Sequence, residues 1–223
     1  MSTEVSLLPD TKEKPSTLFF FTSPILELEK IKTYPVVWLP IFLSFGLSLT
    51  VVILNVMQPE TTKQLIEEIG MKPAEAKNLA ILITFISGII SYPFILLFSS
   101  LILFLLAKIG TEKTTYRQMV SLTAFTMLFS EIGQLINTLF AVLVGTNSHL
   151  TSINGFINAT GFLGGVLNHI EIFTIWSLIL VGVGLHKISN VSKIIAIIIS
   201  VLLFIILLIN GGLSGAVDEG VNL

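Results

Sequence analysis

The 223-residue sequence contains no cysteine, so it can form neither a disulfide framework nor a thiolate metal site. Charge is also scarce, because only 12% of the residues are charged, against about 25% in soluble domains. Hydrophobic residues make up 53%, and the mean hydropathy is +0.92. A net charge of −2 gives no basis for a nucleic-acid partner. Residues 1–14 are polar, unlike a secretory signal peptide, so we expect the N-terminus to be retained. The composition therefore predicts a protein of the lipid bilayer.

Catalytic motifs are missing as well. The sequence has no HExxH, GxSxG or GxGxxG motif and no Walker-type glycine loop. Glu67 and Glu68 form an acidic pair, but the basic residue and histidines of an intramembrane protease do not accompany them. His149, His169 and Glu171 are residue types that suit zinc, yet their scatter over a loop favours exposed histidines over a metal site. We therefore expect a protein that is not an enzyme and uses neither cofactor nor metal.

Several long apolar runs are present. A helix needs about 20 apolar residues to cross a hydrocarbon layer about 30 Å thick. Pro93 is expected to kink the second run, and Gly164 and Gly165 to break the chain before the fourth. Gly161 and Gly165 are spaced as in GxxxG, which indicates close helix packing. Five segments are long enough to span: residues 36–58, 79–107, 119–144, 170–185 and 194–210. The sequence thus predicts an all-α polytopic membrane domain over residues 23–210, with a polar tail at 1–22 and a short external tail at 211–223.

Basic residues are unevenly distributed between the two sides of these spans. Nine Lys and Arg residues fall on one side, four in the N-terminal arm, three in the second-to-third loop and two in the fourth-to-fifth loop. Three fall on the other side. Since short basic loops stay in the cytoplasm, we expect the N-terminus inside and the C-terminus outside.

The arm before the first span is expected to form a short amphipathic helix at the cytoplasmic interface. Ser23 can cap it, Pro24 suits its first position, and Pro35 ends it at Tyr34. Two interpretations remain open: an anchor that sets the entry angle of the first span, or a docking surface for a partner. Such a surface would use basic residues of this arm and of the second-to-third loop, namely Lys30, Lys32, Lys113 and Arg117.

Polar residues form a stripe along the third span, with Ser130 beside it. The stripe consists of Glu131, Gln134, Asn137 and Thr138. A charged group at the bilayer centre costs about 2.5–3.5 kcal/mol, so Glu131 should face protein or water, or stay neutral. We expect a hydrogen-bonded bridge to another span. A proton or cation relay and a misplaced span boundary are the alternatives.

Three stretches resemble the Yip-domain family, the Ypt/Rab-interacting multi-span membrane proteins, in its bacterial branch. They are FTSPILELEKIKTYPVVWLP (residues 21–40), KIGTEKTTYRQMVSLTAF (108–125) and IEIFTIWSLILVGVGLHKIS (170–189). The last is most similar to the family pattern of an acid, an apolar residue, Phe, Thr or Ser, Ile, Trp and an apolar helix ending in Gly. The residues that match the family motifs are Pro24, Pro35, Trp38, Glu171, Phe173, Thr174, Trp176, Gly182 and Gly184.

The resemblance implies a role for Glu171, whose carboxylate would cap or tether the fourth span. The family usually has Asp at this position, and a proline common in its third span is absent near Ser130. The resemblance further implies a non-enzymatic scaffold or accessory protein in the bacterial cytoplasmic membrane, acting through a membrane-protein partner. Eukaryotic relatives are linked to Rab GTPases and membrane traffic, and some bacterial relatives accompany ABC-type exporters. The short arm of this chain, residues 1–35, argues against Rab binding.

Two alternatives to a separate partner protein remain. One is a homo-oligomer. The other is a small ion- or proton-coupled transporter or channel that uses Glu131. Transporters of that kind often contain paired repeats and interrupted helices, and no repeat is visible in this sequence.

Overall fold

The computed structural model describes residues 13–56, 72–145 and 149–221, and within these ranges it contains helices and no β-strand. Five helices are long and apolar enough to cross a membrane: α3 (Trp38–Val56), α5 (Pro73–Ala107), α6 (Tyr116–Val144), α9 (Ile172–Ser189) and α10 (Lys193–Val221). Four short helices accompany them: α1 (Phe19–Thr22), α2 (Pro24–Thr33), α7 (Asn154–Ile157) and α8 (Gly161–His169). The predicted all-α, five-span fold is confirmed. Glu67 and Glu68 lie outside the described residues.

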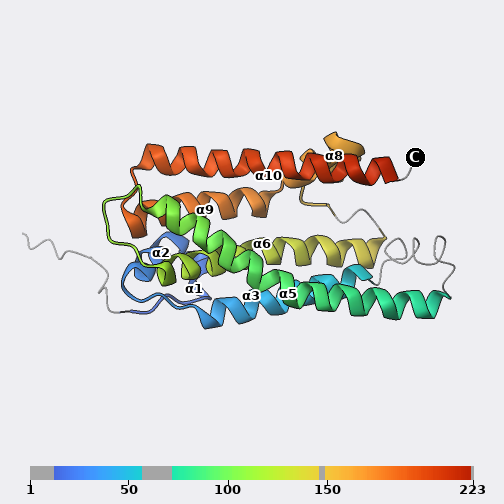
Figure 1. Cartoon of the computed structure of the whole chain (residues 1–223), viewed down its shortest axis with the longest axis horizontal. Helices are drawn as coiled ribbons and strands as arrows, with labels where there is room; N and C mark the ends of the chain where they lie inside the picture. The colour runs from blue at the N-terminus through green and yellow to red at the C-terminus, as the bar shows by residue number, and fades with distance from the viewer. Residues whose placement is uncertain (1–12, 57–71, 146–148, 222–223) are drawn as a thin grey trace, which may run out of the picture.

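The spans form one bundle around α6, which packs against α3, α5 and α9 (Figure 1). Helix α10 packs on α9 and α8. The side on which α1 and α2 lie is called the α2 end below, and the opposite side, with α7 and α8, is called the α8 end. Helix α5 contains Pro93 and changes direction part-way along its length (Figure 1). Proline removes one helical hydrogen bond and crowds the preceding turn, which accounts for the predicted bend.

The N-terminal arm is more deeply packed than an interfacial anchor requires. Helix α2 contacts both α9 and α6. Leu28 and Ile31 are fully buried, whereas Ile25 is 49% exposed. In α1, Phe20 is also fully buried, and its ring centroid lies 4.7 Å from that of Phe125 in α6. The arm is therefore part of the main hydrophobic core, which lies at the α2 end.

The starts of α6 and α2 are capped differently. The hydroxyl of Thr115 accepts from the backbone N–H of Gln118 at 3.3 Å, and the Gln118 side chain accepts from the Thr115 N–H at 2.7 Å. This reciprocal capping box at the start of α6 accords with the sequence pattern of Thr followed three residues later by Gln. Ser23 does precede α2, but its side chain makes no capping hydrogen bond. The prediction that Ser23 caps α2 through its hydroxyl is wrong.

The boundaries around the fourth and fifth spans differ from the expected ones. Gly164 and Gly165 lie inside α8 instead of breaking the chain, and the break falls at Ile170 and Glu171, between α8 and α9. Helix α10 continues to Val221, so most of the segment expected to be a tail is helical. Packing against α8 accounts for this extension, because α8 and α10 are in close contact along this stretch.

Glycines make the contact between α8 and α10 close. A Cβ atom on Gly165 would overlap the carbonyl group of Gly211, and one on Gly215 would overlap the carbonyl oxygen of Gly161. Such approach of two backbones requires residues without side chains. The close packing predicted from the spacing of Gly161 and Gly165 is confirmed, with α10 as the partner helix.

Candidate functional site: a groove between the spans

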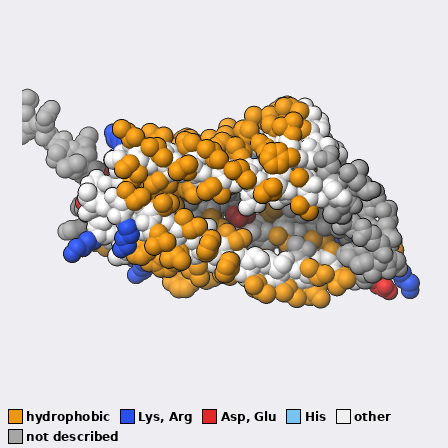
Figure 2. All heavy atoms as spheres, turned by 45° about the horizontal axis from the view of Figure 1, so that its top comes forward, with side chains coloured by type: hydrophobic (Ala, Val, Ile, Leu, Met, Phe, Trp, Pro, Cys, Tyr) orange, Lys and Arg blue, Asp and Glu red, His pale blue; other side chains and the backbone are white. Residues whose placement is uncertain are grey.

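A groove of about 570 Å³ lies in the middle of the bundle between α5 and α10. Its walls are apolar and include Ile95 on α5 and Ile206 on α10, which are 51% and 61% exposed. His169 and Asn210 line it towards the α8 end. Figure 2 shows hydrophobic side chains in two ridges along the bundle, with a hollow between them. The groove is a concave surface within the membrane-spanning part of the molecule.

Hydroxyl side chains from α6 and α9 form the floor of this groove. Ser130 donates to the hydroxyl of Ser177 at 2.9 Å, and Ser177 donates to the backbone carbonyl of Thr126 at 3.2 Å. Thr123 and Thr126 donate back to carbonyls of their own helix. The floor thus joins α6 to α9 while keeping side chains small. Sequence reasoning missed the groove, although Thr123, Thr126 and Ser130 recur at helical spacing on one face of α6.

Glu131 belongs to a different polar cluster, which connects α6 to α3 and α5. Its carboxyl group shares a hydrogen bond with Ser48 of α3 and interacts electrostatically with Tyr92 of α5. The Tyr92 hydroxyl in turn forms a hydrogen bond with Ser44 of α3, whose hydroxyl also donates to the Pro40 carbonyl at 2.6 Å. Polar side chains of three spans therefore meet here: one hydrogen bond joins α6 to α3, another joins α5 to α3, and Glu131 and Tyr92 interact electrostatically.

The other members of the predicted stripe lie elsewhere. Gln134 is exposed. Asn137 and Thr138 are 3% and 2% exposed, and the Asn137 side chain accepts from the backbone N–H of Thr151 at 2.9 Å. Asn137 therefore fixes the segment that follows α6, and the structure does not bring it into the cluster of Glu131.

Glu171 is the N-cap of α9. One carboxylate oxygen accepts from the backbone N–H of Thr174 at 2.7 Å, and the other accepts from the Thr151 hydroxyl at 2.6 Å. The backbone of Glu171 also pairs with that of Ser152 in an isolated antiparallel bridge. A carboxylate at this position accepts from an otherwise unpaired amide, and its negative charge is stabilised by the positive end of the helix dipole. The segment between α6 and α7 is thereby tied to the start of α9.

The remaining motif residues occupy contacts between elements. Gly184 faces the side chain of Leu122 in α6, and Gly182 faces Ser200 in α10. Phe173 packs against Gly133, where an added Cβ would lie 2.7 Å from the Phe173 ring. Pro24 is the first residue of α2, and Pro35 lies in the connection between α2 and α3. Trp38 and Trp176 are 69% and 43% exposed.

The four basic residues of the proposed partner surface differ in environment. Lys30 donates to the buried Glu27 at 2.9 Å, and this hydrogen bond raises the pKa of Lys30. Lys32 pairs with Glu112 at 3.1 Å. Lys113 and Arg117 are exposed, and among the described residues neither forms an ion pair. Two of the four charges are therefore matched within the chain.

The candidate metal ligands do not converge. Among the described residues, no group of three His, Cys, Asp or Glu side chains is placed to hold a metal ion. His169 forms a hydrogen bond through Nδ1 with the Gly165 carbonyl at 3.0 Å, and Glu171 is used as a cap. Burial lowers the pKa of His149, and the nearby His169 lowers it further. The neutral imidazole of His149 is therefore favoured in the folded protein.

Comparison with known proteins gives the family. The model of the Yip1 domain matches residues 18–213, which includes all five spans except the last residues of α10. The chain belongs to the Yip1-domain family. It is 32% identical over 214 residues to "Membrane protein YknW" of Bacillus subtilis (strain 168), and the alignment covers 93% of each chain. No solved structure matches. The family resemblance in the sequence is confirmed, and this Yip1-domain chain is an integral bacterial membrane protein.

Proposed function

We propose that this Yip1-domain protein is a non-enzymatic accessory protein that binds a transmembrane helix of another membrane protein in the groove between α5 and α10. The observation that carries the proposal is the groove itself, which combines exposed apolar walls with a floor of small hydroxyl side chains. A whole helix is about 10 Å across, so a groove of about 570 Å³ receives the side chains along one face of a helix.

The composition of the floor favours a helix over lipid chains as the occupant. Helices associate in membranes through small residues that permit close approach and through hydrogen bonds, because lipid is as apolar as the side chains it surrounds. Ser130 and Ser177 meet both conditions, since they are small and have lone pairs beyond the bond that joins them. A lipid tail would gain nothing from these hydroxyl groups.

The two walls belong to different parts of the bundle. Helix α5 packs on α3 and α6, whereas α10 packs on α9 and α8. The groove therefore lies at the junction of these two packing units, and both of its walls also contribute residues to the core at the α2 end, such as Leu103 of α5 and Ile199 of α10. The family resemblance makes an ABC-type export system a source of the bound helix, and a second copy of this chain is the competing source.

Photocrosslinking inside cells tests the proposal. A photoreactive amino acid is placed at Ile95 or at Ile206, one on each wall of the groove. The matched controls are Ile90 on α5 and Ile197 on α10, which are 66% and 63% exposed and lie outside the groove. We expect a discrete protein adduct from the two groove positions and none from the two controls.

Variants that fill the groove provide a second test of the proposal. Ser99 lines the groove on α5, whereas Ser91 is an exposed serine of the same helix outside it. Ser99→Phe should reduce the adduct about fivefold or more, because an unaccommodated side chain costs about 1–3 kcal/mol, and Ser91→Phe should not. Equal adducts from all four positions, or solute flux by the purified protein alone in liposomes, would contradict the proposal and favour a transporter.

A further inference from the structure

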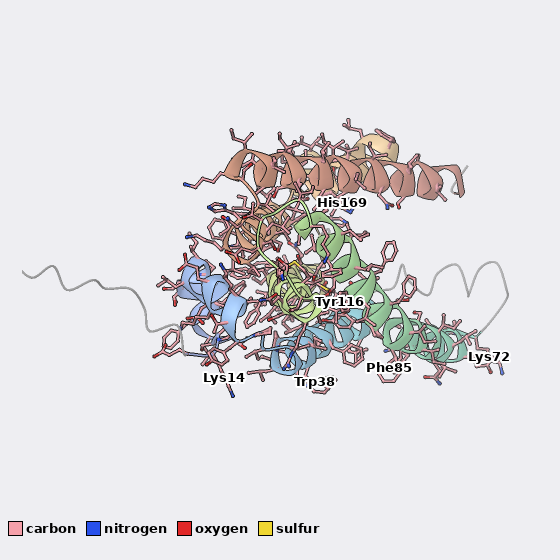
Figure 3. The ribbon with its side chains drawn as sticks, turned by 60° about the vertical axis from the view of Figure 1, so that its left-hand side comes forward. Lys14, Trp38, Lys72, Phe85, Tyr116 and His169 are labelled. Atoms are coloured by element: carbon pink, nitrogen blue, oxygen red, sulfur yellow. The ribbon has the colours of Figure 1, made fainter. Side chains whose placement is uncertain are left out.

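A second cavity, of about 470 Å³, lies where the chain passes from α2 into α3. Residues 33–39 form most of its lining. Two basic side chains complete it, Lys14 from the segment before α1 and Arg117 from the first turn of α6. Figure 3 shows Lys14 and Trp38 at the same end of the bundle. This interfacial cavity, as it is called below, is separate from the groove.

The positive charge of the interfacial cavity is not balanced within the described part of the chain. Lys14 and Arg117 form no ion pair with a described acidic residue, and no acidic residue lines the cavity. The ion pairs near this end join other residues: Lys30 with Glu13 and Glu27, Lys32 with Glu112, and Lys187 with Glu29. Two cations therefore remain available to an anion.

Hydrogen bonds from α6 hold the shape of the cavity. The Gln118 side chain donates to the carbonyl of Lys32 at 2.6 Å, and the Ser121 hydroxyl donates to the carbonyl of Val36 at 2.6 Å. These bonds fix the connection between α2 and α3 to the helix that carries Arg117. The first residues of α3 also line the cavity, and the unpaired amides and dipole of a helix N-terminus stabilise a negative group nearby.

Aromatic residues indicate the level of the cavity relative to the bilayer. Trp38 is the first residue of α3, the first span, and its side chain is 69% exposed. Tyr34 is 38% exposed on the other side of Pro35. Trp and Tyr are enriched where the headgroups of a bilayer meet its hydrocarbon. The cavity therefore opens at the level at which phospholipid phosphates lie.

We infer that the interfacial cavity binds the phosphate of an anionic phospholipid in the leaflet at the α2 end. The Arg117 guanidinium suits bidentate pairing with phosphate oxygens, and Lys14 supplies a second charge. Leu39, which is 54% exposed beside Trp38, contacts the acyl chains. A soluble phosphate offers the same anion, but the adjacent exposed Trp38 and Leu39 match a ligand that carries a hydrocarbon part.

Lipid retention on the purified full-length protein tests this inference. The protein is extracted in mild detergent, incubated with phosphatidylglycerol or phosphatidylcholine, and examined by native mass spectrometry. We expect preferential retention of phosphatidylglycerol. A basic residue near an anionic surface contributes about fivefold in affinity, so Arg117→Gln and Lys14→Gln should each weaken retention about fivefold, and more when combined. Arg117→Lys keeps the charge and should retain most of the preference.

Lys113 provides the matched control. It is an exposed cation in the connection just before α6, four residues before Arg117, without a described ion pair, and it does not line the cavity. Lys113→Gln should leave phosphatidylglycerol retention unchanged, whereas an effect equal to that of Arg117→Gln would show diffuse attraction and overturn the site. Inorganic phosphate added in millimolar excess should not displace the lipid. Displacement would show that the cavity takes the soluble anion and would overturn the lipid assignment.

Discussion

At the scale of single residues, Glu131 carries the main structural question. It lies near the middle of α6, where an unpaired charge costs about 2.5–3.5 kcal/mol. Its hydrogen bond with Ser48 and its proximity to Tyr92 place it between three spans. The bond to Ser48 links α6 to α3, which is the arrangement expected of a bridge between helices.

Substitutions at Glu131 separate these two roles. Glu131→Gln keeps the size and a hydrogen bond, so we expect unchanged stability. Glu131→Leu removes the bond to Ser48 and should lower the free energy of unfolding by about 1–2 kcal/mol, the scale of such bonds between membrane helices. Reversible unfolding in mixed micelles measures both. Gln134→Leu, at an exposed position of the same helix, is the control and should be neutral. Proton or cation flux by the purified protein in liposomes that is lost in Glu131→Gln at full stability would support the relay instead.

Residue roles were predictable where the determining contact is local. The family resemblance implied that the acid at residue 171 caps or tethers the fourth span, and its bond to the Thr174 amide is within one turn. Its second bond, to Thr151, joins residues 20 apart and follows from the path of the chain through α7 and α8. Gln134 and Asn137 shared a predicted stripe, yet only tertiary packing decides that one faces outward and the other is buried.

At the scale of elements, hydrophobic runs predicted all five spans, because length and apolarity decide insertion. They did not predict that α10 extends to Val221, since its last turns contain glycines and polar residues. That stretch is helical where it packs against α8. The same limitation applies to the arm before the first span, whose short amphipathic pattern fits an interfacial helix as well as one packed into the bundle. Phe20 is in the core because α6 offers Phe125 and Phe129 as neighbours.

The contact between α8 and α10 gives a prediction for these elements. In Gly165→Ala, the new methyl group would overlap the backbone of Gly211, which cannot move as a flexible side chain would. We expect a loss of about 1–3 kcal/mol, the usual cost of overpacking, and faster hydrogen exchange in α8. Gly46→Ala is the matched control, because a Cβ there meets no atom within 4 Å. Equal stability of the two variants would show that α8 and α10 pack together less tightly than the structure indicates.

At the scale of the whole molecule, charge is concentrated at one end of an otherwise apolar bundle. The described basic residues at the α2 end include Lys14, Lys30, Lys32, Lys108, Lys113, Arg117, Lys187 and Lys193, whereas Lys72 and Lys77 lie at the opposite end of α5. In Figure 2, Lys and Arg side chains gather mainly at one end. The fold therefore brings together, on one surface, the basic segments that the sequence places in three separate regions.

This asymmetry predicts that the α2 end faces the cytoplasm, because basic segments are retained there during insertion. The absence of cysteine allows single cysteines to report on each end without interference. A membrane-impermeant maleimide applied to intact cells should label cysteines at Lys72 and Gly220, and should label those at Lys113 and Ser192 only after the membrane is opened. All four positions are exposed in the folded protein, so a failure to react reports the side of the membrane and not burial. Labelling at Lys113 in intact cells together with protection at Gly220 would reverse the orientation. It would also move the interfacial cavity to the outer leaflet, where a different set of lipids would reach Arg117.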